Sequence, residues 1–92
     1  MSYRIAFTES YNKKASKWLK KHAALRGQYL KTLQLIELDV NHPSLRLHNI
    51  SGRLSGLSSV SINMSYRITL ELMIGDGDIV LINIGSHDEV NK

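Results

Sequence analysis

Two side chains in the second half of the sequence have the chemistry that phosphodiester cleavage needs. His87 follows the last apolar run, and an imidazole can give or take a proton near neutral pH. Arg67 lies in an alternating run, where a guanidinium can bind a phosphate through two hydrogen bonds and offset developing charge. An ordinary surface histidine that caps a terminal turn would also explain His87. Pairing across strands with Glu71 or another carboxylate would also explain Arg67.

Charge is distributed unevenly along the 92 residues, whose formal net charge is +4. Residues 1–53 contain ten basic and three acidic residues, whereas residues 54–92 contain two and five. The first half is therefore the candidate surface for a polyanion. A lysine run on a helix is commonly only a solvated face, and a basic protein of this size can also bind an acidic protein. The run consists of Lys13, Lys14, Lys17, Lys20 and Lys21.

A second basic group lies in the middle of the chain. Arg46 and His48 alternate with leucines, which predicts a short strand over residues 45–48 with both side chains on one side. Arg53 follows in a segment rich in glycine and serine, which predicts a turn. Five side chains could thus line one concave surface of a sheet: Arg46, His48, Arg53, Arg67 and His87.

Several other kinds of site are disfavoured. The absence of cysteine excludes disulfides, thiolate metal sites and a cysteine nucleophile, and the four histidines lack the spacing of a zinc site. The Gly-Asp-Gly-Asp run at 75–78 joins two apolar runs instead of opening a helix, as a phosphate-binding loop must. We therefore expect no metal and no cofactor. No apolar run approaches the roughly 20 residues of a membrane span, and no signal-peptide pattern opens the chain, so we expect a cytoplasmic protein without membrane contact.

Hydrophobic periodicity predicts the elements that must position these side chains. A period of two predicts a strand over residues 3–8. A helix over about 9–22 follows, capped by Thr8 or Ser10, and a second helix over about 24–39 ends before Pro43. The apolar stripe of the first helix is Tyr11, Ala15, Trp18 and Leu19, and that of the second is Leu25, Tyr29, Leu30, Leu33, Ile36 and Val40.

After Pro43 the pattern is typical of strands. We expect strands over residues 57–62 and 66–74, and an almost continuously apolar strand over 79–84 that lies inside a sheet. The glycines at 75–78 predict a hairpin between the last two. Arg67 has the opposite parity to Tyr66, Ile68, Leu70 and Leu72. The fold class is therefore α+β: one domain over 1–92, with an antiparallel sheet and an N-terminal helix hairpin packed on one face.

Four segments carry a family resemblance. Residues 45–52 and 54–62 contain a leucine–glycine turn and the strand after it, and residues 66–68 read Tyr-Arg-Ile. The ending at 84–90 reads Ile-Gly-Ser-His-Asp-Glu-Val. In order and spacing these segments resemble the RelE/ParE-type toxins, and the ending is similar to the Gly-Thr-His-Asp-Glu-Val-Tyr close of the YafQ-like branch. The resemblance covers nearly the whole chain.

The resemblance implies a bacterial type II toxin–antitoxin toxin of the plasmid-stabilisation class, with a β-α-α-β-β-β(-β) fold. Ribonuclease members cleave mRNA in the ribosomal A site without metal, by activating a 2′-hydroxyl against the adjacent phosphate. By position, His87 would be the acid or base and Arg67 would stabilise phosphate charge. The residues implied to hold RNA are Arg46, His48 and Arg53 along the substrate backbone, and Lys13, Lys17 and Lys20 of the first helix towards ribosomal RNA.

The implied partners are a cognate antitoxin, the ribosome with its mRNA, and operator DNA only through the antitoxin complex. The chain departs from the family pattern at Ser61, where several ribonucleases have a second histidine or basic residue, and at Asn91, where an aromatic residue is common. Two other functions stay open: a ParE-like inhibitor of DNA gyrase, and a non-catalytic module that binds an antitoxin. His87 favours the ribonuclease, whereas Ser61 and Asn91 favour the non-catalytic module.

Overall fold

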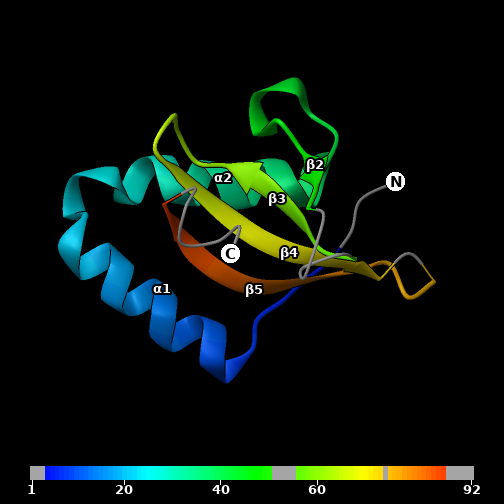
Figure 1. Ribbon diagram of the computed structural model, residues 1–92, viewed down its shortest axis with the longest axis horizontal. Helices are drawn as coiled ribbons and strands as arrows, with labels where there is room; N and C mark the ends of the chain where they lie inside the picture. Colours follow the sequence, from blue (N-terminus) through cyan, green and yellow to red (C-terminus); the bar gives the residue numbers. More distant parts are fainter. Residues whose placement is uncertain (1–3, 51–55, 74, 87–92) are drawn as a thin grey trace.

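A computed structural model describes residues 4–50, 56–73 and 75–86, in which two helices pack against a five-stranded sheet (Figure 1). The strands lie in the order β1-β5-β4-β3-β2. All neighbours are antiparallel except β1 and β5, which are parallel. The α+β fold predicted from the sequence is confirmed. The strand bounds are β1 Arg4–Ala6, β2 His48–Asn49, β3 Ser58–Ser61, β4 Tyr66–Met73 and β5 Asp78–Ser86.

Helix α1 spans Glu9–Lys21 and buries the stripe that its sequence predicts. Tyr11, Ala15 and Trp18 recur at spacings of four and three, so they lie on one face of the helix and enter the core. Thr8 is the N-cap, because its Oγ1 accepts a hydrogen bond from the backbone N–H of Tyr11 at 3.0 Å. The other candidate cap, Ser10, lies inside the helix.

Helix α2 spans Arg26–Leu38 and follows a 3-10 turn, η1, at Ala23–Leu25. Tyr29 and Ile36 enter the core as predicted, but Leu30 is 48% exposed, so its assignment to the buried stripe was wrong. Each residue of a helix turns about 100° from the previous one, which carries Leu30 away from the face that Tyr29 buries. The hydroxyls of Tyr29 and Tyr11 lie 3.0 Å apart and join the two helices inside the core.

Strands β4 and β5 form a long hairpin in the interior of the sheet, and their side chains alternate between its two faces (Figure 1). Ile68 and Leu70 are fully buried in the core with α1 and α2, whereas Arg67 has the opposite parity. The turn depends on Gly77, whose φ of +70° favours glycine. Thr69 pairs with Asn83 and Leu70 pairs with Leu81, so a β-bulge leaves one residue of β5 without a cross-strand partner.

The segment between α2 and β3 differs from the predicted strand over residues 45–48. A 3-10 turn, η2, occupies Pro43–Leu45, and Arg46 follows with a left-handed backbone at φ +50°. The turn forms because His42 Nδ1 accepts from the N–H of Ser44 at 3.1 Å and the Pro43 carbonyl accepts from Arg46 at 3.2 Å. Only His48–Asn49 pairs as a strand, with β3. None of the helices in the described ranges is long and apolar enough to span a membrane.

Candidate functional site

Arg67 lies near the start of β4, on the face of the sheet opposite the helices. Its position follows from strand alternation, because its neighbour Ile68 is fully buried against the helices. Directly across the ladder, Arg67 pairs with Ser61 of β3 and Gly85 of β5. Both partners are small, so they leave room over the strand for the long guanidinium side chain.

Four hydrogen bonds to described residues fix the guanidinium of Arg67. Its Nε donates to Oγ of the fully buried Ser59 at 2.9 Å, and one terminal nitrogen, Nη2, also reaches the Ser59 carbonyl at 3.4 Å. The same Nη2 donates to the Arg46 carbonyl at 3.0 Å and contacts Nδ1 of His48 at 2.9 Å. Nη1, the other terminal nitrogen, donates to no side chain or carbonyl in the described part of the chain. Among the described residues the guanidinium is therefore held through Nε and Nη2, and Nη1 has no hydrogen-bond partner there.

The contact with Arg67 also fixes the proton on the His48 ring. A guanidinium has only donors, so Nδ1 of His48 must accept. A neutral imidazole that accepts at Nδ1 carries its proton on Nε2, and this N–H is the one left to donate elsewhere. His48 is exposed and pairs with Ser59 across β2 and β3.

The cluster formed by Arg46, His48, Ser59 and Arg67, here named the Arg67 cluster, is electropositive. Burial lowers the pKa of Arg67 from its ordinary value, and the positive charge of Arg46 lowers it further. Within the described ranges the one ion pair joins Arg4 and Asp78 at 3.4 Å, at the opposite end of β5. Two guanidinium groups with no carboxylate partner among the described residues form a site suited to an anion with several oxygens.

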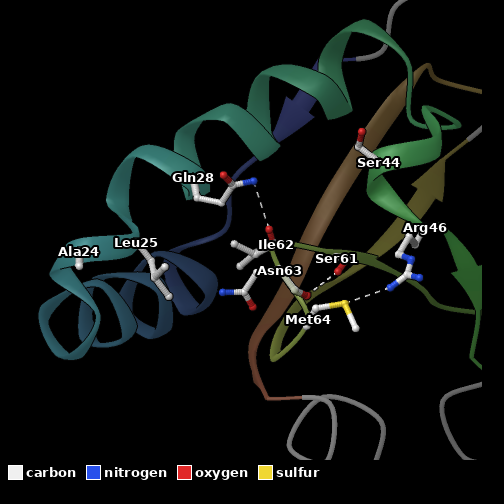
Figure 2. A pocket seen from close by; sticks show the side chains of 9 residues that line it. All are labelled: Ala24, Leu25, Gln28, Ser44, Arg46, Ser61, Ile62, Asn63 and Met64. Carbon is white, nitrogen blue, oxygen red and sulfur yellow. Dashed lines mark hydrogen bonds between the residues drawn. The ribbon is translucent and has the colours of Figure 1, made fainter.

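A cleft of about 660 Å³ adjoins the cluster (Figure 2). The Arg46 side chain points into it, and its Nη1 lies 3.4 Å from the sulfur of Met64, which is exposed on the β3–β4 turn. The hydroxyl of Ser61 donates to the Asn63 carbonyl at 2.6 Å. Ser61 is thus bound to the turn, and nothing among the described residues activates it as a base.

The lysines predicted to bind RNA lie on α1, away from the Arg67 cluster. Lys13, Lys17 and Lys20 are exposed and line a groove along the outer face of this helix. They therefore do not share a surface with Arg67, which lies on the opposite face of the sheet. Of the five side chains proposed to line one concave surface, the structure brings together Arg46, His48 and Arg67, and the predicted sites at Arg53 and His87 lie outside the described residues.

Sequence reasoning missed two features. The first is that Ser59 holds Arg67. The only feature of the sequence that indicates this role is that Ser59 has the same parity as Ser61 on β3, the strand that pairs with β4. The second feature is a cleft between α1 and the sheet, which contains lysines outside the predicted set. Its signal was a spacing of seven between Lys14 and Lys21, with Trp18 between them. No group of three or more His, Asp or Glu residues in the described ranges is placed to hold a metal ion.

This arrangement of helices and strands is that of the RelE/ParE-type toxins. The crystal structure of YafQ from E. coli strain BL21(DE3) matches with a TM-score of 0.78 and 12% sequence identity, over 98% of this chain and 99% of that one. The toxin of the E. coli DinJ–YafQ toxin–antitoxin complex matches over 100% of both chains, with a TM-score of 0.76 and 14% identity. A YoeB/ParE toxin from Agrobacterium tumefaciens matches with a TM-score of 0.71 and 13% identity, over 91% of this chain and 98% of that one.

No protein-family model and no curated protein matches the sequence. The similarity is therefore one of fold, and it confirms the RelE/ParE resemblance, with its YafQ-like character, at that level.

Proposed function

We propose that this protein is the toxin of a type II toxin–antitoxin system and that it cleaves mRNA on the ribosome without a metal ion. The observation that carries the proposal is the Arg67 cluster. The guanidinium is held at 2.9 Å by the buried Ser59 hydroxyl and lies beside an imidazole, on a toxin fold. This combination suits a phosphate that gains charge during a reaction.

The reaction is an internal transfer of the phosphoryl group. A base takes the proton of a 2′-hydroxyl, and the 2′-oxygen forms a bond to the adjacent phosphorus. The bond from phosphorus to the 5′-oxygen of the next nucleotide breaks, and an acid protonates that oxygen. The products are a 2′,3′-cyclic phosphate and a 5′-hydroxyl. The phosphate oxygens carry more negative charge in the transition state than in the substrate, and Arg67 would bind them there.

His87 is our candidate for the acid or base. In the sequence it follows Ser86 directly, and Ser86 is the last residue of β5 and pairs with Tyr66, the neighbour of Arg67 on β4. His48, expected to hold the RNA backbone, has its proton on Nε2, from where it can donate to a phosphate oxygen. Arg46 and Arg53 complete the proposed contacts to the substrate backbone.

The proposed partners follow from the same reading. A toxin of this fold has been crystallised in a toxin–antitoxin complex, which supports a cognate antitoxin here. Operator DNA would be bound only through that complex. The exposed lysines of α1 support contact with ribosomal RNA, because exposed ammonium groups bind phosphates with little regard to sequence. The ribosome would orient the mRNA, and the site of action would be the cytoplasm.

Expression of this chain alone in a bacterial host tests the proposal. Growth is followed and mRNA 5′ ends are mapped for the wild type, His87→Ala and Arg67→Ala. The matched control is Arg26→Ala, which removes an exposed arginine at the start of α2. We expect new cuts within translated codons for the wild type and the control, and none for the other two variants. Full toxicity of His87→Ala would contradict the catalytic assignment.

A non-catalytic, antitoxin-binding module is the second candidate. The observation that favours it is Ser61, whose hydroxyl is bound to the Asn63 carbonyl at 2.6 Å and supplies no second base. Normal growth on expression would support this module. Growth arrest with intact mRNA would instead support the gyrase-inhibitor alternative.

A further inference from the structure

A second cleft, of about 440 Å³, lies between α1 and the end of the sheet where β4 begins and β5 ends. Its volume falls in the range of small-ligand sites. Tyr66 of β4 lines it, and Arg67 is the next residue in the same strand, with opposite parity. The two sites therefore lie on opposite faces of one strand. We name the second one the α1 cleft.

Three rings form one wall of the α1 cleft. The imidazole of His22 contacts both other rings, with centroid distances of 4.8 Å to Trp18 and 4.6 Å to Tyr66. Trp18 and Tyr66 meet edge to face at 5.4 Å. Trp18 is buried, whereas His22 and Tyr66 are half-buried and keep part of their rings accessible. The planes of these two rings are tilted by 52° to one another, and both rings contact the buried indole.

The rim of the α1 cleft is positive. Lys14, Lys17 and Lys21 recur at spacings of three and four, so they lie on one face of α1, and all three are exposed. None of the nine described residues that line the cleft is acidic. No ion pair among the described residues involves these lysines, since the only pair found there joins Arg4 and Asp78. Asn83, Ile84 and Ser86 also line the cleft.

We propose that the α1 cleft binds a base of single-stranded RNA, stacked on His22 with Tyr66 beside it, with the flanking phosphates on the three lysines. Stacking rings beside a positive groove are what single-stranded nucleic acids require, because every base has a π-face and every nucleotide has a charge. The proposal rests on the proposed function for the choice of RNA over other anions. It adds a second RNA segment, held across the sheet from the segment that Arg67 would cleave.

Trp18 is the only tryptophan of the chain, so its fluorescence reports directly on this cleft. The full chain is titrated with a single-stranded RNA nonamer whose 2′-hydroxyls are all methylated, which prevents cleavage by the proposed reaction. We expect saturable quenching that weakens with salt. His22→Ala should weaken binding on the order of tenfold, because a stacking partner is lost. A nonamer without bases should bind the wild type and His22→Ala equally.

Two matched triple variants distinguish binding of the nonamer in the α1 cleft from general attraction to a positive surface. Lys14→Gln, Lys17→Gln and Lys21→Gln together remove the rim, and we expect the slope of log K against log salt to fall by about two. The control combines Arg4→Gln, Arg26→Gln and Lys31→Gln, which removes the same charge from exposed positions outside the cleft. Equal losses in both triples, or no effect of His22→Ala, would overturn the proposal.

Arg67→Ala separates this inference from the proposed function. Because Arg67 is outside the α1 cleft, quenching by the nonamer should persist in this variant even where cleavage of mRNA is lost. Quenching without any mRNA cleavage by the wild type would contradict only the proposed function. Cleavage without quenching would contradict only the α1 cleft. Circular dichroism of each variant confirms that the fold is retained.

Discussion

The Arg67 cluster and the α1 cleft are both positive, but they hold their charges in different ways. Arg67 is fixed by hydrogen bonds to the buried Ser59, to the Arg46 carbonyl and to His48. The lysines of α1 are exposed and have no ion-pair partner in the described ranges. A fixed charge can match one transition state, whereas mobile charges bind many phosphates with similar affinity. The difference predicts that single substitutions act strongly in the cluster and weakly on the helix.

The strongest expected effect is at Arg67. Arg67→Lys keeps a positive charge but loses the fork of donors, and Arg67→Ala loses both. We expect the rate of mRNA cleavage on the ribosome to fall on the order of 100-fold or more in each variant, because a transition-state donor is removed. Single-turnover cleavage measures this rate. An Arg67→Lys variant that cleaves at the wild-type rate would show that a positive charge alone is sufficient. The fixed guanidinium would then act no differently from the mobile lysines of α1.

The next effect concerns Ser59, which we regard as a positioning residue. Ser59→Ala removes the acceptor of Arg67 Nε, and we expect about a tenfold loss in kcat with a smaller change in KM. The hydroxyl should contribute only about 1 kcal/mol to the free energy of unfolding. In an Arg67→Ala background the same substitution should not slow cleavage further. Additive losses in the double variant would contradict a role exerted through Arg67.

A smaller effect is expected on the free energy of unfolding, through the Tyr11–Tyr29 pair that joins α1 to α2. Burial raises the pKa of Tyr11 and of Tyr29, and the hydrogen bond between them raises that of Tyr11 further. Tyrosines of the unfolded chain titrate near pH 10, so above this pH the unfolded state loses protons that the folded state keeps. The free energy of unfolding should therefore fall as pH rises above about 10.

Chemical denaturation between pH 8 and pH 11 measures this dependence. Tyr11→Phe with Tyr29→Phe removes both hydroxyls together and should flatten the alkaline fall. A single Tyr11→Phe substitution leaves the Tyr29 hydroxyl without its partner in the core and should cost about 1–2 kcal/mol at neutral pH. If the free energy of unfolding of the double variant fell as steeply above about pH 10 as that of the wild type, the assignment of this fall to Tyr11 and Tyr29 would be contradicted.

The smallest expected effect is that of one lysine. Lys17→Ala should weaken binding of the methylated nonamer by less than about threefold at 150 mM salt, because one of several exposed phosphate contacts is lost. The loss should be larger at 50 mM salt, where screening is weaker. A loss of binding on the order of 100-fold, as large as the expected loss of cleavage rate in Arg67→Ala, would show that the lysines act as a fixed site. The cluster and the helix would then not differ in how they hold their charges.

Local patterns were sufficient to predict most of the elements. The stripe of α1, the parity of Arg67 on β4 and the turn at Gly77 each depend on residues close together in the sequence. The parallel pairing of β1 with β5 was not predicted, because it joins residues more than 70 positions apart and no turn signals it. Leu30 was misplaced because α2 is apolar around much of its circumference, so its sequence does not define one buried face.

The site was predicted less completely than the fold. Alternation indicated that Arg67 leaves the core face, but its contacts depend on how β2, β3 and β4 are aligned. Arg46 was expected on a strand beside His48, yet it contributes its backbone carbonyl from a left-handed turn. The roles of His87 and Arg53 stay predictions from the sequence and its resemblance.

The bulge in β5 has a consequence for insertions and deletions. Ile79 and Ile84 are both buried in the core although an odd number of positions separates them, because Ile82 has no partner on β4. Deleting this one residue would join Leu81 directly to Asn83, and their partners Leu70 and Thr69 are already adjacent on β4. Ile84 would therefore keep its place in the core, and Gly85 would stay beside Arg67. One residue inserted elsewhere in β5, with no bulge to absorb it, would instead exchange the two faces for the rest of the strand. The strand is therefore expected to tolerate the loss of one residue at the bulge better than the gain of one.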